Sequence, residues 1–254
     1  MYNSLWSLVK ELVLNYNPCF RGQIRRYKYA EMLWKALLYE EKKLIFLRAP
    51  TGIGKTEAIL TPFLFQFLND YMPSGWLSLI HCLPTRSLVH FMYERVCRST
   101  NSWFARGLRI SIDYGDPHLV KPYLEGDIVV TTYDTLLYTT YGIRSRGLHY
   151  KLPMAKVSMS LIVMDEIQLL QDSAWYSFSV LPKHIKSLLK IGAIVVMMSA
   201  TLPKALIDDI LRETSYIEEN PAIIESPDVT PRGFLNVEIC KITPENIIND
   251  LIKH

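Results

Sequence analysis

The stretch Lys43–Glu57, with the sequence KLIFLRAPTGIGKTE, constrains the fold more than any other part of the chain. A short apolar run predicts a buried strand, two glycines interrupt the loop after it, and a Lys-Thr pair opens the next helix. Gly52 and Gly54 allow backbone angles that other residues avoid, so successive N–H groups can point at one anion. The helix N-terminus adds its positive dipole end. This strand–loop–helix pattern predicts a phosphate-binding loop.

The side chains of this loop predict a nucleotide site with a metal ion. We expect Lys55 to reach the β- and γ-phosphates of ATP and the Thr56 hydroxyl to ligate Mg²⁺. Ala49 stands where the pattern G-x-x-x-x-G-K-T begins with glycine. The alternative, a glycine-rich turn without a ligand, explains neither the Lys-Thr pair nor the flanking elements. The residues expected around the nucleotide are Thr51, Gly52, Ile53, Gly54, Lys55, Thr56 and Glu57.

Composition limits the class of protein. The chain has 254 residues, of which 49% are hydrophobic, so it can bury a large core. The net charge of +3 is too small to indicate a nucleic-acid binder by itself. No apolar run approaches the roughly 18 residues of a membrane span, and the N-terminus lacks the order of a signal peptide. We therefore expect a cytoplasmic protein without membrane association. The cysteines and histidines form no cluster with metal-ligand spacing.

Apolar strands alternate with helices along most of the chain, which predicts an α/β fold with a mostly parallel sheet and helices on both faces. The first helix is amphipathic, and we expect it to pack on the sheet. The expected strands are 44–47, 76–83, 108–112, 127–132, 160–164 and 193–198, and the expected helices are 1–15, 25–40, 55–69, 87–97, 175–190 and 204–212.

Composition changes after Thr214. Three prolines within 220–232 predict an extended linker, and the strand and helix patterns beyond it are too short to form a domain. We expect one ATP-binding domain over residues 1–215, followed over 216–254 by a linker and the start of a truncated second domain.

Polar residues follow the expected strands, and the carboxyl ends of parallel strands share the edge where ligands bind. We expect Asp165 to hold Mg²⁺ and Glu166 to orient or deprotonate the attacking water. A solvated acidic turn is the alternative. We expect Gln168, two residues after Glu166, to respond to the γ-phosphate by hydrogen bonding. Ser199 and Thr201, after the next strand, either bridge the acidic loop to the γ-phosphate or cap a helix, and the residues alone favour neither.

Further polar residues suit a nucleic-acid strand. Arg86, Thr131 and Thr132 lie at the same expected edge, where they can contact phosphates without reading sequence. Each is otherwise a surface residue or a helix cap. The span between Asp134 and Asp165 has no acidic residue and carries basic and aromatic side chains. Such a span suits single-stranded nucleic acid, and the alternative is a solvated loop.

Five stretches of this sequence together resemble the motifs of superfamily-two helicases, in their order and spacing. The motifs belong to the first RecA-like domain of such motors. The run DEIQLLQDSAWY and the form SATLP make the chain most similar to the CRISPR-associated helicase of type I interference systems. The five stretches are APTGIGKT (49–56), PTR (84–86), TTYDTLL (131–137), DEIQ (165–168) and SATLP (199–203).

The resemblance implies an ATP- and Mg²⁺-dependent helicase that moves along single-stranded DNA in CRISPR interference against foreign DNA. Its implied partners are a guide-RNA surveillance complex, a separate nuclease subunit or domain, and a second RecA-like domain. The roles implied are phosphate and Mg²⁺ binding for Lys55 and Thr56, Mg²⁺ binding and water activation for Asp165 and Glu166, coupling of hydrolysis to movement for Ser199 and Thr201, and strand contacts for Arg86 and Thr132.

Three departures from the family pattern have consequences. Lys28, after Tyr27, stands where relatives carry an adenine-reading Gln, with Gln23 as a less well placed substitute, and Gln168 stands where many relatives carry His. We also expect the second RecA-like domain and its arginines to lie outside this chain. We therefore expect nucleotide binding but very slow hydrolysis by this chain alone. The alternatives are another superfamily-two DNA or RNA helicase, and a nucleotide-gated binding or scaffold domain without turnover.

Overall fold

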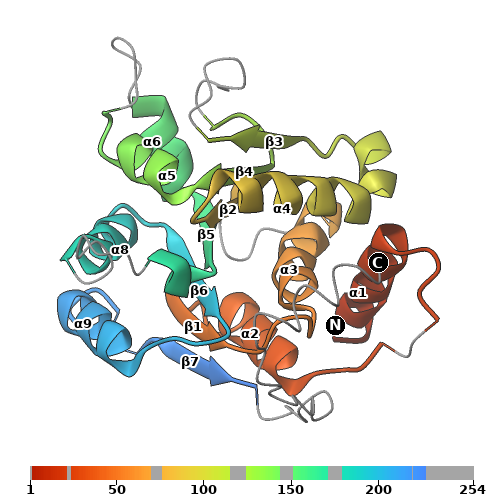
Figure 1. The fold of residues 1–254 in the computed structure, drawn as a ribbon, viewed down its shortest axis with the longest axis horizontal. Coiled ribbons are helices and arrows are strands. Elements are labelled where there is room, and N and C mark those ends of the chain that lie inside the picture. The colour runs from red at the N-terminus through yellow and green to blue at the C-terminus, as the bar shows by residue number, and fades with distance from the viewer. Residues whose placement is uncertain are drawn as a thin grey trace, which may run out of the picture.

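A seven-stranded parallel sheet forms the centre of the molecule, with the strand order β3-β4-β2-β5-β6-β1-β7 (Figure 1). The computed structural model describes residues 2–21, 24–69, 76–114, 124–143, 151–170, 179–218 and 220–226. All six pairings run parallel, which confirms the predicted α/β class. The strands are β1 (Leu44–Arg48), β2 (Ser78–Leu83), β3 (Ile110–Asp113), β4 (Ile128–Thr132), β5 (Ser160–Asp165), β6 (Ile194–Ser199) and β7 (Ala222–Glu225).

Helices cover both faces of the sheet, as predicted (Figure 1). Alternate residues of β1 point to opposite faces: Ile45 and Leu47 pack under one helical layer, and Leu44 and Phe46 under the other. The first layer consists of α1 (Tyr2–Tyr16), α2 (Lys28–Leu38), α3 (Lys55–Asn69) and α4 (Arg86–Ser99), and the second of α5 (Tyr133–Thr140), α6 (Lys151–Ser158), α8 (Leu181–Lys190) and α9 (Lys204–Thr214). Two short 3₁₀ turns, η1 (Asn101–Arg106) and η3 (Ile167–Leu170), complete the described elements.

The first helix packs mainly against other helices of its layer. Helix α1 lies mainly against α3 and α4, whereas we predicted that it would pack on the sheet itself. Its Trp6 ring meets Trp34 of α2 edge-on, with 4.9 Å between ring centroids. Asn15 Nδ2 donates to the Ser99 carbonyl oxygen at 3.0 Å, and Trp103 Nε1 donates to Glu11 at 3.0 Å. These contacts make α1 an integral part of the domain.

A proline inside α3 frees one carbonyl group, and a tryptophan from α2 binds it. Pro62 has no N–H, so it cannot donate to the carbonyl of Ala58, four residues earlier. Trp34 Nε1 donates to that carbonyl oxygen at 2.8 Å, and the Trp34 side chain is fully buried. The helix therefore continues past Pro62 to Asn69.

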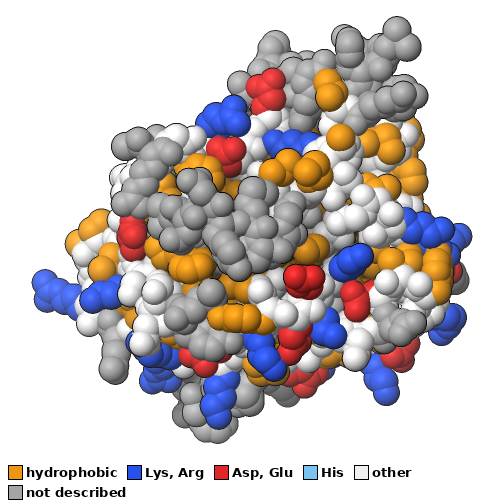
Figure 2. Space-filling view, turned by 180° about the vertical axis from the view of Figure 1, so that it is seen from behind, with side chains coloured by type: hydrophobic (Ala, Val, Ile, Leu, Met, Phe, Trp, Pro, Cys, Tyr) orange, Lys and Arg blue, Asp and Glu red, His pale blue; other side chains and the backbone are white. Residues whose placement is uncertain are grey.

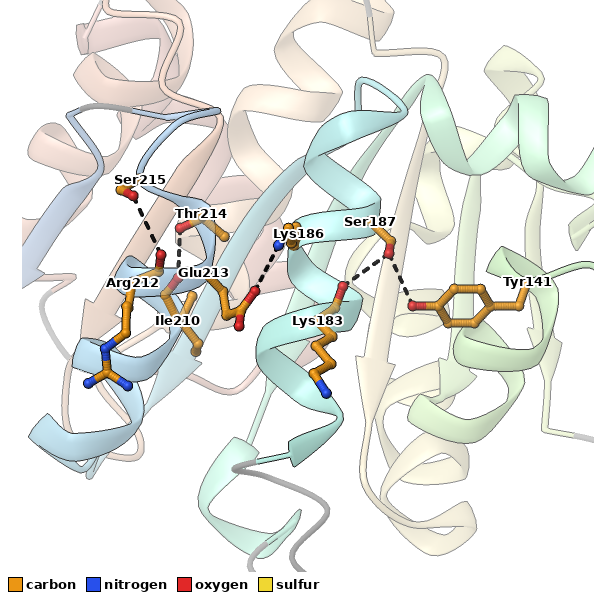
Figure 3. Close-up of polar contacts among 9 residues, drawn as sticks. All are labelled: Tyr141, Lys183, Lys186, Ser187, Ile210, Arg212, Glu213, Thr214 and Ser215. Carbon is orange, nitrogen blue, oxygen red and sulfur yellow. Dashed lines mark hydrogen bonds and ion pairs between the residues drawn. The ribbon is translucent and has the colours of Figure 1, made fainter.

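Polar contacts join the helices of the second layer to one another (Figure 3). Lys186 of α8 forms an ion pair with Glu213 of α9 at 2.8 Å, and Tyr141, just after α5, hydrogen-bonds Ser187 of α8 at 3.1 Å. The structure begins α8 at Leu181, and the first part of the helix expected over 175–190 lies outside the described residues.

The segment predicted as a linker contributes an edge strand, so that part of the domain prediction is wrong. Strand β7 pairs with β1 in parallel, and Ser226 N donates to the Arg48 carbonyl oxygen at 3.0 Å. The Arg48 side chain also binds Glu225 at 2.9 Å. The sheet thus extends beyond residue 215. The strand and helix predicted beyond 232 lie outside the described residues.

The surface carries charges of both signs. On the face seen in Figure 2, the described Lys and Arg side chains are interspersed with Asp and Glu and form no single basic patch. This distribution agrees with the small net charge of +3. Among the helices that the structure describes, none is long and apolar enough to cross a membrane.

Candidate nucleotide site

The loop between β1 and α3 has the backbone that its glycines predict. Gly52 and Gly54 have φ angles of 75° and 89°, a region that costs other residues strain. The Tyr29 hydroxyl of α2 donates to the Ile53 carbonyl oxygen at 2.8 Å and so fixes the middle of the loop. Ala49 N donates to the Ser199 carbonyl oxygen of β6 at 3.1 Å. The loop is therefore held from α2 on one side and from β6 on the other.

Lys55 lies folded into this loop. Its Nζ donates to the carbonyl oxygens of Ala49 at 2.7 Å and Pro50 at 3.2 Å. Burial lowers the pKa of the Lys55 amine, and the nearby carboxylates of Asp165 and Glu166 oppose that shift. This electrostatic coupling places the predicted lysine and the predicted acidic pair in one site.

The first turn of α3 carries the other two predicted side chains. Thr56 is 5% exposed and Glu57 is 4% exposed. Glu57 forms an ion pair with Arg95 of α4 at 2.7 Å, which compensates a carboxylate that is otherwise removed from water. Thr51, at the opposite end of the loop, is exposed. Glu57 therefore acts as an anchor between α3 and α4, next to the residues that face the loop.

The acidic pair lies at the end of β5 with its first carboxylate fixed at both oxygens. Asp165 Oδ1 accepts from the Glu166 backbone N–H at 2.9 Å, and Asp165 Oδ2 accepts from His81 Nε2 at 3.3 Å. Glu166 has a φ of 53°, which is uncommon for a residue with a side chain. Such strain is concentrated at functional sites, and here it turns the chain sharply after the strand.

Gln168 bridges the acidic loop to the end of β6. Its Nε2 donates to Glu166 Oε2, and its Oε1 accepts from the Ser199 hydroxyl. The Thr201 backbone N–H donates to Ser199 Oγ at 3.1 Å. Pro203, rather than Ser199 or Thr201, occupies the position before α9, and no side chain caps that helix. Of the two predicted roles, the structure therefore places Ser199 in the bridge, while the Thr201 side chain is exposed.

The sheet order explains why these groups meet. Strands β5, β6 and β1 are consecutive neighbours, so Asp165, Ser199 and the loop after Arg48 leave the sheet side by side. Figure 1 shows these three strands side by side in the sheet. The nucleotide residues predicted from positions far apart in the sequence thus converge at one edge.

The three residues predicted to contact nucleic acid differ in how far their side chains are exposed. Arg86 is exposed at the start of α4, with its guanidinium carbon 5.8 Å from the centroid of the Tyr114 ring. Thr131 is fully buried and donates to the Asp113 carbonyl oxygen, so its side chain does not face a bound strand and that prediction is wrong. Thr132 is 6% exposed and caps α5 by accepting from Thr135 N at 3.4 Å. Only Arg86 presents its side chain to solvent.

A cavity of about 610 Å³ opens beside the phosphate loop. Its walls come from α1, from the chain before α2 and from the loop itself, and they include several aromatic rings. Tyr27 lines this cavity, Lys28 begins α2, and Gln23 lies outside the described residues. Sequence reasoning gave α1 no role here. The aromatic lining residues are Trp6, Tyr16, Phe20, Tyr27 and Tyr29.

The donor set suits Mg²⁺ bound together with a nucleotide. Within the described ranges, no group of three or more His, Cys, Asp or Glu side chains could hold a metal ion by itself. Mg²⁺ is commonly held by one or two protein oxygens, with phosphate and water completing the shell. Asp165 is the last residue of β5, and Thr56 lies in the first turn of α3, directly after the phosphate loop. Both side chains provide such oxygens.

His81 was missed by the sequence reasoning, although a signal was present. It interrupts the otherwise apolar centre of β2, SLIHCL, every residue of which is buried. A polar side chain within a fully buried strand requires a partner, and Asp165 is that partner.

Comparison with known proteins agrees with this geometry. A family model for DEAD/DEAH box helicases matches residues 27–210. The CRISPR-associated helicase Cas3 of Thermoproteus tenax is 31% identical over 181 residues, which cover 66% of this chain and 31% of that protein. This chain therefore spans about a third of the length of that curated relative.

Solved structures show the same fold at low identity. The match to T. fusca Cas3 with ADP has a TM-score of 0.57 at 19% identity and covers 80% of this chain and 23% of that one. The match to the helicase MrfA bound to DNA and AMPPNP has a TM-score of 0.61 at 17% identity and covers 87% and 29%. A hypothetical ATP-dependent RNA helicase from Sulfolobus tokodaii matches with a TM-score of 0.56 at 20% identity and covers 87% and 57%.

These likenesses confirm the predicted RecA-like fold, and the family match covers more than half of the chain. The chain belongs to the DEAD/DEAH box helicase family.

Proposed function

We propose that this chain is the ATP-binding half of an ATP-dependent single-stranded-DNA translocase that acts in CRISPR interference. One observation carries the proposal: the phosphate loop, the Asp165–Glu166 pair and the Gln168–Ser199 bridge leave three neighbouring strands at one sheet edge. A structural ion-pair network would not need the lysine, the strained carboxylate turn and the glycine loop together.

Each residue has a distinct part in the proposed reaction. Lys55 exchanges its carbonyl partners for the β- and γ-phosphate oxygens of the bound nucleotide. Thr56 and Asp165 would hold Mg²⁺, which when bound neutralises charge on the phosphates. Glu166 orients the attacking water and accepts its proton. Gln168 lies between Glu166 and Ser199, so it can pass a change at the γ-phosphate to the SATLP segment.

The nucleobase would occupy the cavity beside the phosphate loop. Its aromatic walls suit a flat ring, and they include Tyr27, which precedes the position where relatives carry the adenine-reading Gln. Tyr27→Ala is therefore expected to weaken binding of a fluorescent ATP analogue. Unchanged affinity would place the base elsewhere.

The proposed motor is completed by a second RecA-like domain that follows this one. Transition-state charge on the γ-phosphate normally requires an arginine finger, which contributes about 10³–10⁵ in rate. We assign that arginine to the second domain. This chain alone should consequently bind nucleotide but hydrolyse it very slowly.

The CRISPR assignment rests on the likeness to the Thermoproteus tenax helicase and on the DEIQ and SATLP motifs. It implies that the motor moves along single-stranded DNA in the cytoplasm. Its implied partners are a guide-RNA surveillance complex and a nuclease subunit or domain. Arg86, exposed at the sheet edge, is the proposed backbone contact.

The test is ATP hydrolysis and binding of a fluorescent ATP analogue, measured with and without single-stranded DNA. We expect binding that Lys55→Ala abolishes, with little turnover in either case. Lys183→Ala, which removes an exposed lysine of α8, is the matched control and should bind normally. Fast DNA-stimulated turnover by this chain would refute the assignment of the arginine to a second domain.

The choice of nucleic acid is tested separately. We expect single-stranded DNA to bind at least as tightly as RNA of the same sequence and at the same salt concentration, with Arg86→Ala weakening both. Selective binding of RNA would replace the CRISPR proposal with an RNA helicase.

A further inference from the structure

His81 occupies an unusual place for a titratable side chain. It lies in β2, next to the centre of the sheet, and its exposed fraction is 0%. Every other residue of β2 is also buried, and none of them can titrate except Cys82. A buried imidazole that only filled space would be better replaced by an apolar side chain, because burying polar groups costs free energy.

The strand register explains which group His81 meets. His81 is paired with Val163 of β5, and Asp165 follows two residues later on the same face of the sheet. This face also carries α3, the helix that follows the phosphate loop. The contact is made by Nε2, at 3.3 Å from Asp165 Oδ2.

The donor and acceptor chemistry of the two side chains determines the direction of this hydrogen bond. A carboxylate only accepts, so the hydrogen lies on His81 Nε2. Among the residues that the structure describes, none forms a hydrogen bond with His81 Nδ1. The other carboxylate oxygen of Asp165 accepts from the Glu166 backbone N–H at 2.9 Å. Removal of the imidazole would leave Asp165 held at one oxygen and free to turn about its terminal torsion.

We propose that His81 is a positioning residue that orients the Asp165 carboxylate for the metal ion bound with the nucleotide. The inference rests on the proposed function, because it takes Asp165 as the metal-binding carboxylate. Groups that hold a metal-binding side chain in place typically contribute about 10–100-fold to metal affinity. His81 itself touches neither the nucleotide nor the reacting atoms.

The experiment measures how strongly Mg²⁺ tightens binding of a fluorescent, non-hydrolysable ATP analogue. The dissociation constant is determined in EDTA and again in saturating Mg²⁺, and their ratio reports the metal contribution without any turnover. His81→Asn and His81→Gln form a matched pair, because both carry an amide donor and only the longer Gln side chain reaches as far as Nε2.

We expect His81→Asn to lower the ratio about 10-fold or more while the dissociation constant in EDTA stays the same, and His81→Gln to restore most of the ratio. His184→Gln is the control for a buried histidine, since its partners Tyr133 and Thr140 lie outside the site. It should leave the ratio unchanged. All variants are compared at a temperature at which circular dichroism shows them folded.

Two outcomes overturn the inference and one overturns its foundation. If His81→Asn keeps the wild-type ratio, or if His184→Gln lowers the ratio equally, His81 has no positioning role. Asp165→Asn serves as the reference. If that variant also keeps the wild-type ratio, Asp165 is not the metal-binding carboxylate, and the proposed function fails at that point rather than the role of His81.

Discussion

Trp34 and Pro62 should be energetically coupled, because the indole N–H replaces the backbone donor that proline lacks. In Trp34→Phe the Ala58 carbonyl loses its partner inside the core. A buried acceptor left without a hydrogen bond costs about 1–3 kcal/mol. The smaller ring removes apolar contacts worth about 1 kcal/mol more. We therefore expect Trp34→Phe to lower the free energy of unfolding by about 2–4 kcal/mol.

A second substitution separates these two contributions. Pro62→Ala restores a backbone N–H at the position that bonds the Ala58 carbonyl in a regular helix. In the Pro62→Ala background, Trp34→Phe should therefore cost only the packing loss, about 1 kcal/mol. The double-mutant cycle should show a coupling energy of about 1–3 kcal/mol, which lies in the range found for residues that share a partner.

The assay is urea denaturation of the four proteins, followed by far-UV circular dichroism. Trp34→Ala is not suitable, because the cavity that it leaves would obscure the hydrogen bond. If Trp34→Phe costs the same in both backgrounds to within about 0.5 kcal/mol, the indole does not act as the substitute donor.

Three further substitutions test the site and the core. Burial lowers the pKa of His184 to about 3. The His184 side chain therefore takes up a proton near pH 6.5 in the unfolded chain but stays neutral in the folded chain at that pH. Stability should fall as the pH drops below 6.5, by about 2 kcal/mol at pH 5, and His184→Gln should flatten that part of a pH series of denaturation curves. Arg95→Met leaves Glu57 buried without its cation and should cost about 3 kcal/mol in the same denaturation assay, the lower end for a buried pair because Arg95 is partly exposed. Gly54→Ala forces a side chain into a φ of 89° and should cost about 1–2 kcal/mol while weakening binding of the ATP analogue.

The sequence was sufficient for the elements with strong local signals. The helix Lys55–Asn69 begins and ends where the Lys-Thr pair and the apolar run predicted. Six of the strands were found because continuous apolar runs of this length, each followed by polar residues, are typical of buried parallel strands. The convergence of Lys55, Asp165 and Ser199 followed from the general rule that parallel strands share a carboxyl edge.

The features that were missed depend on contacts distant in the sequence. Strand β7 is a short edge strand between Pro221 and Pro227, and these flanking prolines favoured a linker until its pairing with β1 was known. Thr131 was predicted to contact a nucleic-acid strand. It is instead buried in β4, between β2 and β3, and its hydroxyl donates to the Asp113 carbonyl oxygen. His81 meets Asp165 only through the register of two strands that lie more than 80 positions apart, which no local pattern encodes.

The pairing of β7 with β1 also bears on how a shortened version of this chain would behave in solution. Strand β1 is apolar over Leu44–Leu47 and contains no proline. A chain ending at residue 215 would expose its unpaired N–H and C=O groups along one edge, and such edges recruit strands from other molecules. Loss of four residues of β7 would therefore turn a buried strand beside the nucleotide loop into a nucleus for aggregation.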